Sequence, residues 1–184
     1  VNVKNWLDGI PSNCKVRLDP NGSFSTSELM VWLEEFKDED RIEFIEQPLP
    51  DSKREELFNL SHISPVPLAI DETIVAMGGP RNAAENGWNG FYVIKPTLLN
   101  DWSSVFNFVY EMPDCSVIST VFESPFGFEA LLRLCRYSNL NSGVFRSIFN
   151  HLNSEFVSHH EKQLFSPSVS QQELDELWDR FCYV

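Results

Sequence analysis

The sequence predicts an α/β fold of the (β/α) barrel type, and three observations lead to this prediction. Short apolar segments of strand type alternate with segments that carry the signals of amphipathic helices. This alternation is typical of βαβ units and of a parallel sheet that is buried on both faces. The units repeat every 24 to 27 residues, and each predicted strand ends in a polar residue. In a barrel such strand ends meet at one mouth, where the active site lies.

Five apolar segments of strand type carry the repeat. Their polar ends are separated by 27, 25, 24 and 24 residues, which favours a closed barrel over an open doubly wound sheet with its more variable crossovers. A weaker sixth strand is expected at 143–148. The five predicted strands are 14–19, 42–46, 66–71, 91–95 and 116–120.

Helical signals follow the strands. Ser25 and Glu28 have the spacing of a capping box, as do Ser170 and Glu173, and Asp101 is placed to cap another helix. Behind these caps, apolar residues recur with the helical period. The expected inner faces are Leu29, Trp32, Leu33 and Phe36; Trp102, Val105, Phe106 and Val109; Phe128, Leu131, Leu132 and Cys135; and Leu174, Leu177, Trp178 and Phe181.

Composition excludes several classes of function. The 184 residues carry a net charge of −13 at pH 7, and no basic stripe exists to neutralise nucleic-acid phosphates. No apolar run approaches the roughly 18 residues of a membrane-spanning helix. The four cysteines show neither CxxC spacing nor a disulfide framework, so we expect a reduced, intracellular chain.

The polar residues at the strand ends point to a metal site. Asp19, Glu46 and Asp71 end three successive strands, and Lys95 ends the fourth. A single acid at such a place is more often a helix cap or a solvated turn residue, and a single lysine often reaches the surface. Three carboxylates at one barrel mouth would repel one another, however, unless they share a hard cation. Mg²⁺ suits such oxygen ligands, with Mn²⁺ as a possible substitute.

The strand-end sequences "RLDPN", "IEFIEQP", "LAIDET", "VIKPTL" and "VISTVFESPFG" resemble those of the enolase superfamily. The order acid, acid, acid, lysine is similar to that of the muconate-lactonising subgroup. Within it, "RLDPN", "VIKPT" and the S-x-x-x-E-S-x-x-G pattern most resemble the o-succinylbenzoate synthases. The resemblance covers about residues 12 to 150. It implies the C-terminal five or six βα units of a TIM-type barrel, spanning residues 1–184 as one partial barrel domain.

The resemblance also implies roles for individual residues. Asp19, Glu46 and Asp71 would be Mg²⁺ ligands, and Lys95 would be the catalytic lysine that stabilises an enolate through its charge. The expected substrate-binding residues are Arg17, Asn21, Ser119, Thr120, Glu123 and Ser124.

The implied reaction is the Mg²⁺-dependent syn dehydration of 2-succinyl-6-hydroxy-2,4-cyclohexadiene-1-carboxylate to o-succinylbenzoate, through a metal-stabilised enediolate. This step belongs to menaquinone or phylloquinone biosynthesis. The implied partner is therefore a small carboxylate substrate, with neither nucleic acid nor membrane involved. The implied location is the cytoplasm, or the plastid stroma in a photosynthetic eukaryote.

The sequence departs from the family in one serious way. The base of the synthases is a lysine in a K-x-K motif at the end of the second barrel strand, and neither Lys4 nor Lys15 has that context. We expect that strand, and the N-terminal capping domain, to be absent from this chain and supplied by the same protein or by a second chain. The 184 residues alone are expected to be inactive.

Two other hypotheses remain open. The chain could belong to another enzyme of the subgroup, such as a dipeptide epimerase, an N-acylamino-acid racemase or a cycloisomerase. It could also be a non-catalytic scaffold derived from a barrel, with exposed sheet edges that invite pairing. Retention of three acids and Lys95 argues against a scaffold.

Overall fold

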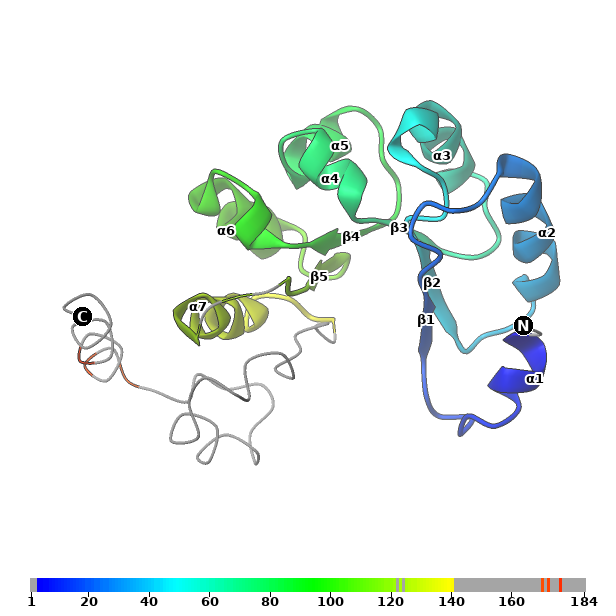
Figure 1. The fold of residues 1–184 in the computed structure, drawn as a ribbon, viewed down its shortest axis with the longest axis horizontal. Coiled ribbons are helices and arrows are strands. Elements are labelled where there is room, and N and C mark those ends of the chain that lie inside the picture. The colour runs from blue at the N-terminus through cyan, green and yellow to red at the C-terminus, as the bar shows by residue number, and fades with distance from the viewer. Residues whose placement is uncertain are drawn as a thin grey trace. The chain divides into compact units, whose positions relative to one another are not determined.

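The computed structural model describes residues 3–121, 123, 125–140, 170, 172 and 176 of the chain. It divides into two compact units, Val1–Tyr92 and Val93–Val184, and strands alternate with helices along both (Figure 1). The helices are α1 (Val3–Leu7), α2 (Thr26–Phe36), α3 (Arg54–Ser61), α4 (Glu72–Ala76), α5 (Pro80–Glu85), α6 (Trp102–Glu111) and α7 (Pro125–Cys135), with 3₁₀ turns η1 (Asp51–Lys53) and η2 (Pro96–Leu98). The strands are β1 (Val16–Leu18), β2 (Ile42–Glu46), β3 (Leu68–Ile70), β4 (Phe91–Ile94) and β5 (Ser116–Ile118).

The described strands form one five-stranded sheet in chain order, β1-β2-β3-β4-β5. The pairs β1–β2, β2–β3 and β3–β4 are parallel. Every residue of β3 and β5 is buried, as expected for strands that are covered on both faces. The predicted parallel α/β fold with a helix after each strand is therefore confirmed. The predicted β2 has the observed bounds, whereas the other strands are one to three residues shorter than predicted.

In the first unit, α2 begins at the predicted capping box. The Ser25 side chain accepts a hydrogen bond from the Glu28 amide, and the Glu28 carboxylate accepts one from the Ser25 amide at 2.7 Å. Leu29, Leu33 and Phe36 are buried, as the helical period predicted. The cap and the apolar stripe together fix where α2 begins and which face it turns to the core.

The start of β4 is packed too closely for any side chain. A Cβ atom on Gly90 would lie 2.4 Å from the Leu68 carbonyl oxygen and 2.7 Å from the Trp88 ring. Trp88 is itself buried, and its indole N–H donates to the Phe91 carbonyl at 3.1 Å. Glycine at position 90 therefore sets the close approach between β3 and the start of β4.

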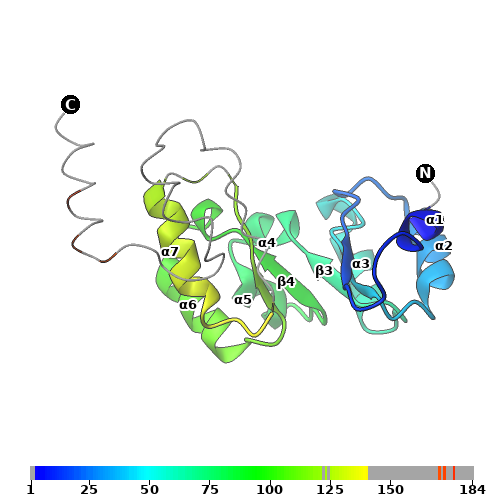
Figure 2. The same cartoon turned by 90° about the horizontal axis from the view of Figure 1, so that it is seen from below.

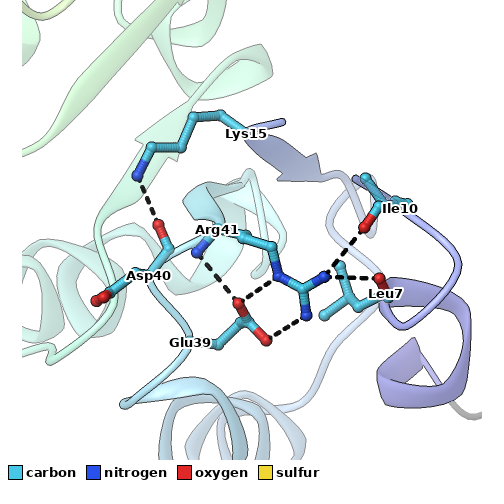
Figure 3. Close-up of polar contacts among 6 residues, drawn as sticks. All are labelled: Leu7, Ile10, Lys15, Glu39, Asp40 and Arg41. Atoms are coloured by element: carbon cyan, nitrogen blue, oxygen red, sulfur yellow. Dashed lines mark hydrogen bonds and ion pairs between the residues drawn. The ribbon is translucent and has the colours of Figure 1, made fainter. Parts of the chain in front are cut away.

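Arg41, just before β2, holds the N-terminal segment of the first unit in place (Figure 3). Its guanidinium donates to both Glu39 carboxylate oxygens, at 2.7 and 2.8 Å, and to the carbonyl oxygens of Leu7 and Ile10 at 2.7 and 3.4 Å. The Glu39 carboxylate raises the pKa of Arg41, chiefly through this hydrogen bonding. Lys15 donates nearby to the Asp40 carbonyl at 2.6 Å. Arg41 thus ties the end of α1 to the start of β2.

In the second unit, α6 and α7 lie side by side (Figure 2), and Asp101 caps α6 by accepting from the Ser104 amide at 3.0 Å. The predicted inner face of α6 was partly wrong. Trp102 and Phe106 are 37% and 38% exposed, whereas the buried residues are Val105, Phe108 and Val109. The Phe106 ring instead contacts Tyr137, beyond the end of α7, with 4.7 Å between ring centroids.

The predicted sixth strand at 143–148 lies outside the described residues, as does most of the predicted terminal helix. Gln172 and Glu176 are helical, and the Gln172 side chain donates to Glu176 at 3.0 Å. Among the described helices, none combines the length and apolar character needed to cross a bilayer.

Candidate metal and substrate site

The three predicted metal ligands come at the C-terminal ends of neighbouring parallel strands. Asp19 follows β1, Glu46 ends β2 and Asp71 follows β3. The strand register pairs Leu18 with Ile45, and Glu46 with Ala69. Asp19 is therefore the register partner of Glu46. Asp71 lies two residues beyond Ala69, which is the register partner of Glu46 on β3.

Contacts between side chains show which face of the sheet these residues share. The Arg17 guanidinium lies 4.9 Å from the Phe44 ring centroid, and the Phe44 and Phe91 rings are 5.2 Å apart. Ala69 is the register partner of Phe91. Side chains alternate between faces along a strand. Asp19, Glu46 and Asp71 lie two residues after Arg17, Phe44 and Ala69, respectively. The alternation therefore places the three acids on the same face of the sheet as those residues.

The three carboxylates differ in their surroundings. Asp19 is exposed, and its Oδ1 accepts a hydrogen bond from the Asn21 amide at 2.9 Å. Glu46 is half-buried, and Asp71 is only 3% exposed. Within the described part of the chain, no three Asp, Glu, His or Cys side chains are gathered closely enough to hold a metal ion. The donor types and their shared face suit Mg²⁺, but the side chains are not drawn together.

Arg17 and Asn21, which the resemblance assigned to substrate binding, make local contacts. Arg17 Nε donates to Glu43 Oε2 at 2.7 Å, and both side chains are about four-fifths buried. A β-bulge between Val16 and Arg17 shifts the register there. Asn21 adopts a left-handed backbone with φ of 50° in the turn that follows Asp19. Glu43 is a contact of the Arg17 guanidinium that sequence reasoning did not find.

The remaining predicted residues belong to the second unit. Lys95, directly after β4, is half-buried, as are Ser119 and Thr120 at the end of β5. The Ser119 amide donates to the Ile94 carbonyl at 2.8 Å, so the ends of β4 and β5 are joined beside Lys95. Ser124 lies outside the described residues.

Glu123 is 5% exposed, and its carboxylate is engaged by the protein itself. Its Oε1 accepts from the Thr97 hydroxyl at 2.8 Å and from the Val121 amide at 2.9 Å. Thr97 stands two residues after Lys95, so this contact ties the turn that follows Lys95 to the turn that follows β5. Sequence reasoning missed Thr97, although its place in "VIKPT", two residues after the lysine, was a usable signal.

Gln47 is the other residue that sequence reasoning did not assign to the site. It follows Glu46 directly, is 2% exposed and has a left-handed backbone with φ of 35°. Its side-chain amide accepts from the Asp71 and Thr73 backbone amides, and donates to the Thr73 hydroxyl and to the Leu49 carbonyl. The available signal in the sequence was a glutamine between a candidate ligand and a proline.

Comparison with known proteins agrees with this arrangement of strand ends. The model of the "Enolase C-terminal domain-like" family matches residues 3–99, more than half of the chain. The chain belongs to this family. The matched region contains β1 to β4, the three strand-end acids and Lys95. The predicted resemblance to the enolase superfamily is thus confirmed.

Individual relatives within the enolase superfamily agree on the fold. An o-succinylbenzoate synthase from Thermosynechococcus vestitus is 33% identical over 106 residues, which are 56% of this chain and 33% of that protein. The crystal structure of o-succinylbenzoate synthase from Thermosynechococcus elongatus BP-1, complexed with Mg in the active site, superposes with a TM-score of 0.70 at 24% identity. The superposition covers 97% of this chain and 53% of the synthase chain. The muconate lactonizing enzyme from Pseudomonas putida gives 0.60 at 20% identity, covering 73% of this chain and 39% of its own.

These matches establish the fold class. The chain forms part of the (β/α) barrel of the enolase superfamily. It spans about a third of the curated relative and about half of the Thermosynechococcus elongatus structure.

Proposed function

We propose that this chain forms the greater part of the barrel of an o-succinylbenzoate synthase. The observation that carries the proposal is the run of three carboxylates at the ends of β1, β2 and β3, on the face that Arg17, Phe44 and Phe91 define. The curated relative at 33% identity supports this choice within the superfamily.

In this proposal Asp19, Glu46 and Asp71 hold Mg²⁺ at the mouth of the barrel. Bound there, the ion would supply Lewis-acid stabilisation to negative charge that develops on a substrate carboxylate. Lys95 would place an ammonium group against the anionic substrate, which favours charge developing nearby in a site that excludes water.

The turns after β4 and β5 would shape the rest of the substrate pocket. The contact between Thr97 and Glu123 fixes these two turns to each other, so Ser119 and Thr120 keep their places relative to Lys95. Because the Glu123 carboxylate is already engaged by Thr97 and Val121, we propose that it positions these turns and does not contact the substrate.

The proposed reaction is the syn dehydration of 2-succinyl-6-hydroxy-2,4-cyclohexadiene-1-carboxylate to o-succinylbenzoate, in menaquinone or phylloquinone synthesis in the cytoplasm or plastid stroma. It requires a base, and no K-x-K motif occurs in the 184 residues. We propose that the base comes from a further strand that pairs with this barrel portion, as part of the same protein or as a second chain.

The test is a complementation assay. The 184-residue chain is assayed for o-succinylbenzoate formation with Mg²⁺, alone and co-expressed with the N-terminal domain and first strands of the Thermosynechococcus enzyme. We expect negligible turnover alone and measurable turnover in the complemented form. In that form Asp71→Asn and Lys95→Met should each lower kcat by at least about 100-fold, in line with the usual contribution of a charged group in an active site.

Two controls make the assay decisive. Asp38→Asn makes the same chemical change at an exposed acid and should leave turnover unchanged. Dipeptide, N-acylamino-acid and muconate substrates are assayed in parallel. Faster turnover of one of these would replace the synthase with that activity, and no turnover of any substrate together with no Mg²⁺ binding would favour a scaffold.

A further inference from the structure

Gln47 occupies an unusual place in the first unit. It directly follows Glu46 at the end of β2, it is 2% exposed, and its φ of 35° puts it in the left-handed region. Left-handed backbone is unfavourable for a residue with a side chain, and it persists only where the surroundings fix it. The hydrogen bonds of Gln47 hold its backbone in this conformation.

The Gln47 side chain uses its full capacity for hydrogen bonding. Its Nε2 donates to the Leu49 carbonyl at 2.8 Å and to Thr73 Oγ1 at 2.9 Å. Its Oε1 accepts from the backbone amides of Asp71 at 2.9 Å and Thr73 at 3.2 Å. A neutral amide offers two donors and an acceptor oxygen, and all are satisfied here.

The Gln47 backbone makes two further hydrogen bonds, to β3 and to the turn that follows β1. Its N–H donates to the Ala69 carbonyl at 2.8 Å, and its carbonyl accepts from the Gly22 amide at 2.6 Å. One buried residue therefore bonds to the turn after Asp19, adjoins Glu46 covalently and holds the amide of Asp71.

We infer that Gln47 is a positioning residue that sets the places of Glu46 and Asp71 relative to each other. The inference rests on the proposed metal site. Leucine would leave all four partners without their bonds to the side chain.

The test measures Mn²⁺ binding directly, by the loss of the free-ion electron paramagnetic resonance signal, in the complete protein without substrate. Gln47→Leu should weaken Mn²⁺ binding by about 10- to 100-fold, the usual effect of removing a partner that orients metal ligands. Thr73→Val removes the hydroxyl that accepts from Gln47 Nε2 and keeps a side chain of similar volume, so it should weaken Mn²⁺ binding by a smaller factor.

The matched control is Ser61→Ala, at the end of α3. It also removes two hydrogen bonds, one donated to the Phe58 carbonyl at 2.7 Å and one accepted from the Asn89 amide at 3.2 Å. It should lower the melting temperature but leave Mn²⁺ affinity within about twofold, well below the effect expected at an orienting partner. In Gln47→Leu, hydrogen exchange at the Asp71 and Thr73 amides should quicken more than the drop in global stability explains.

Each outcome has a clear meaning. Wild-type binding with unchanged affinity in the Gln47 and Thr73 variants would overturn the positioning role and leave the proposed function intact. Equal losses in Ser61→Ala would reduce Gln47 to a stabilising residue and also overturn it. If the wild-type protein binds no Mn²⁺, the metal site of the proposed function fails, and this inference fails with it.

Discussion

Replacing Gly90 with alanine should destabilise the first unit because the structure leaves no space for a methyl group at the start of β4. The added Cβ would lie 2.4 Å from the Leu68 carbonyl oxygen, and 2.7 and 3.0 Å from two carbons of the Trp88 ring. The Leu68 oxygen belongs to the backbone of β3 and cannot swing away as a flexible side chain could. Either β4 moves off β3 or the strands distort.

The magnitude follows from these contacts. Forcing a methyl group into a packed region costs about 1–3 kcal/mol, and the 2.4 Å approach to backbone places Gly90 at the upper end of that range. Displacement of Trp88 would also break its bond to the Phe91 carbonyl, worth about 1 kcal/mol. Alanine lowers the entropy of the unfolded chain and so offsets about 0.5 kcal/mol. We expect a loss of about 3.5 kcal/mol in the free energy of unfolding, a large part of the ~5–15 kcal/mol of a typical domain.

Urea unfolding followed by far-UV circular dichroism measures this loss, with Gly87→Ala as the matched control. Gly87 has a φ of +91° but open space around its Cβ position, so alanine there adds only backbone strain of roughly 1–2 kcal/mol. Gly90→Ala should therefore be the more destabilising of the two. A loss below about 1 kcal/mol, the low end of overpacking costs, or one smaller than that of Gly87→Ala, would refute the packing argument.

Three further predictions test other parts of the chain. Arg41→Met should lower the melting temperature and quicken hydrogen exchange in α1, because the Leu7 and Ile10 carbonyls lose their donor; Lys37→Met, at a surface ion pair with Glu34, should do neither. The Ser25 hydroxyl, and then its backbone amide, lower the pKa of Glu28. The stability that this interaction contributes is present above the unfolded-state pKa of Glu28 and is lost as pH falls through the folded-state pKa. Ser25→Ala should therefore raise the pKa of Glu28 in an NMR titration, and its stability difference from wild type should shrink in acid; an unchanged Glu28 titration would contradict the capping box. Burial, and then Asp114, raise the pKa of the Cys115 thiol, so iodoacetamide should alkylate exposed Cys14 first by peptide mass spectrometry, and equal rates would count against this.

Several features of the fold were determined by short stretches of sequence. The β2 strand has its predicted bounds, and α2 begins at the capping box of Ser25 and Glu28. Asp101 caps α6 as predicted. These features depend on contacts within a few residues, so composition and spacing were sufficient to predict them. The order of acids and lysine at the strand ends is likewise a property of the sequence, and it was sufficient to indicate the family.

The same reasoning failed where burial depends on neighbouring elements. The period of α6 was correct, but the inner face was placed one step off, so Phe106 was expected inside and Phe108 was not mentioned. A helix with apolar residues around much of its surface leaves its orientation to whatever packs against it. Here the Tyr137 ring after α7 contacts Phe106 on its outer side.

The supporting contacts of the candidate site were decided by tertiary structure alone. Gln47 bonds to Asp71 and Thr73, 24 and 26 residues away, and Thr97 bonds to Glu123, 26 residues away. Such pairs meet only because strand register brings particular turns together, and no local pattern records a register. The sequence by itself determined which chemical groups stand at the strand ends. Only the packing of one strand against the next decided which neighbours hold those groups in place.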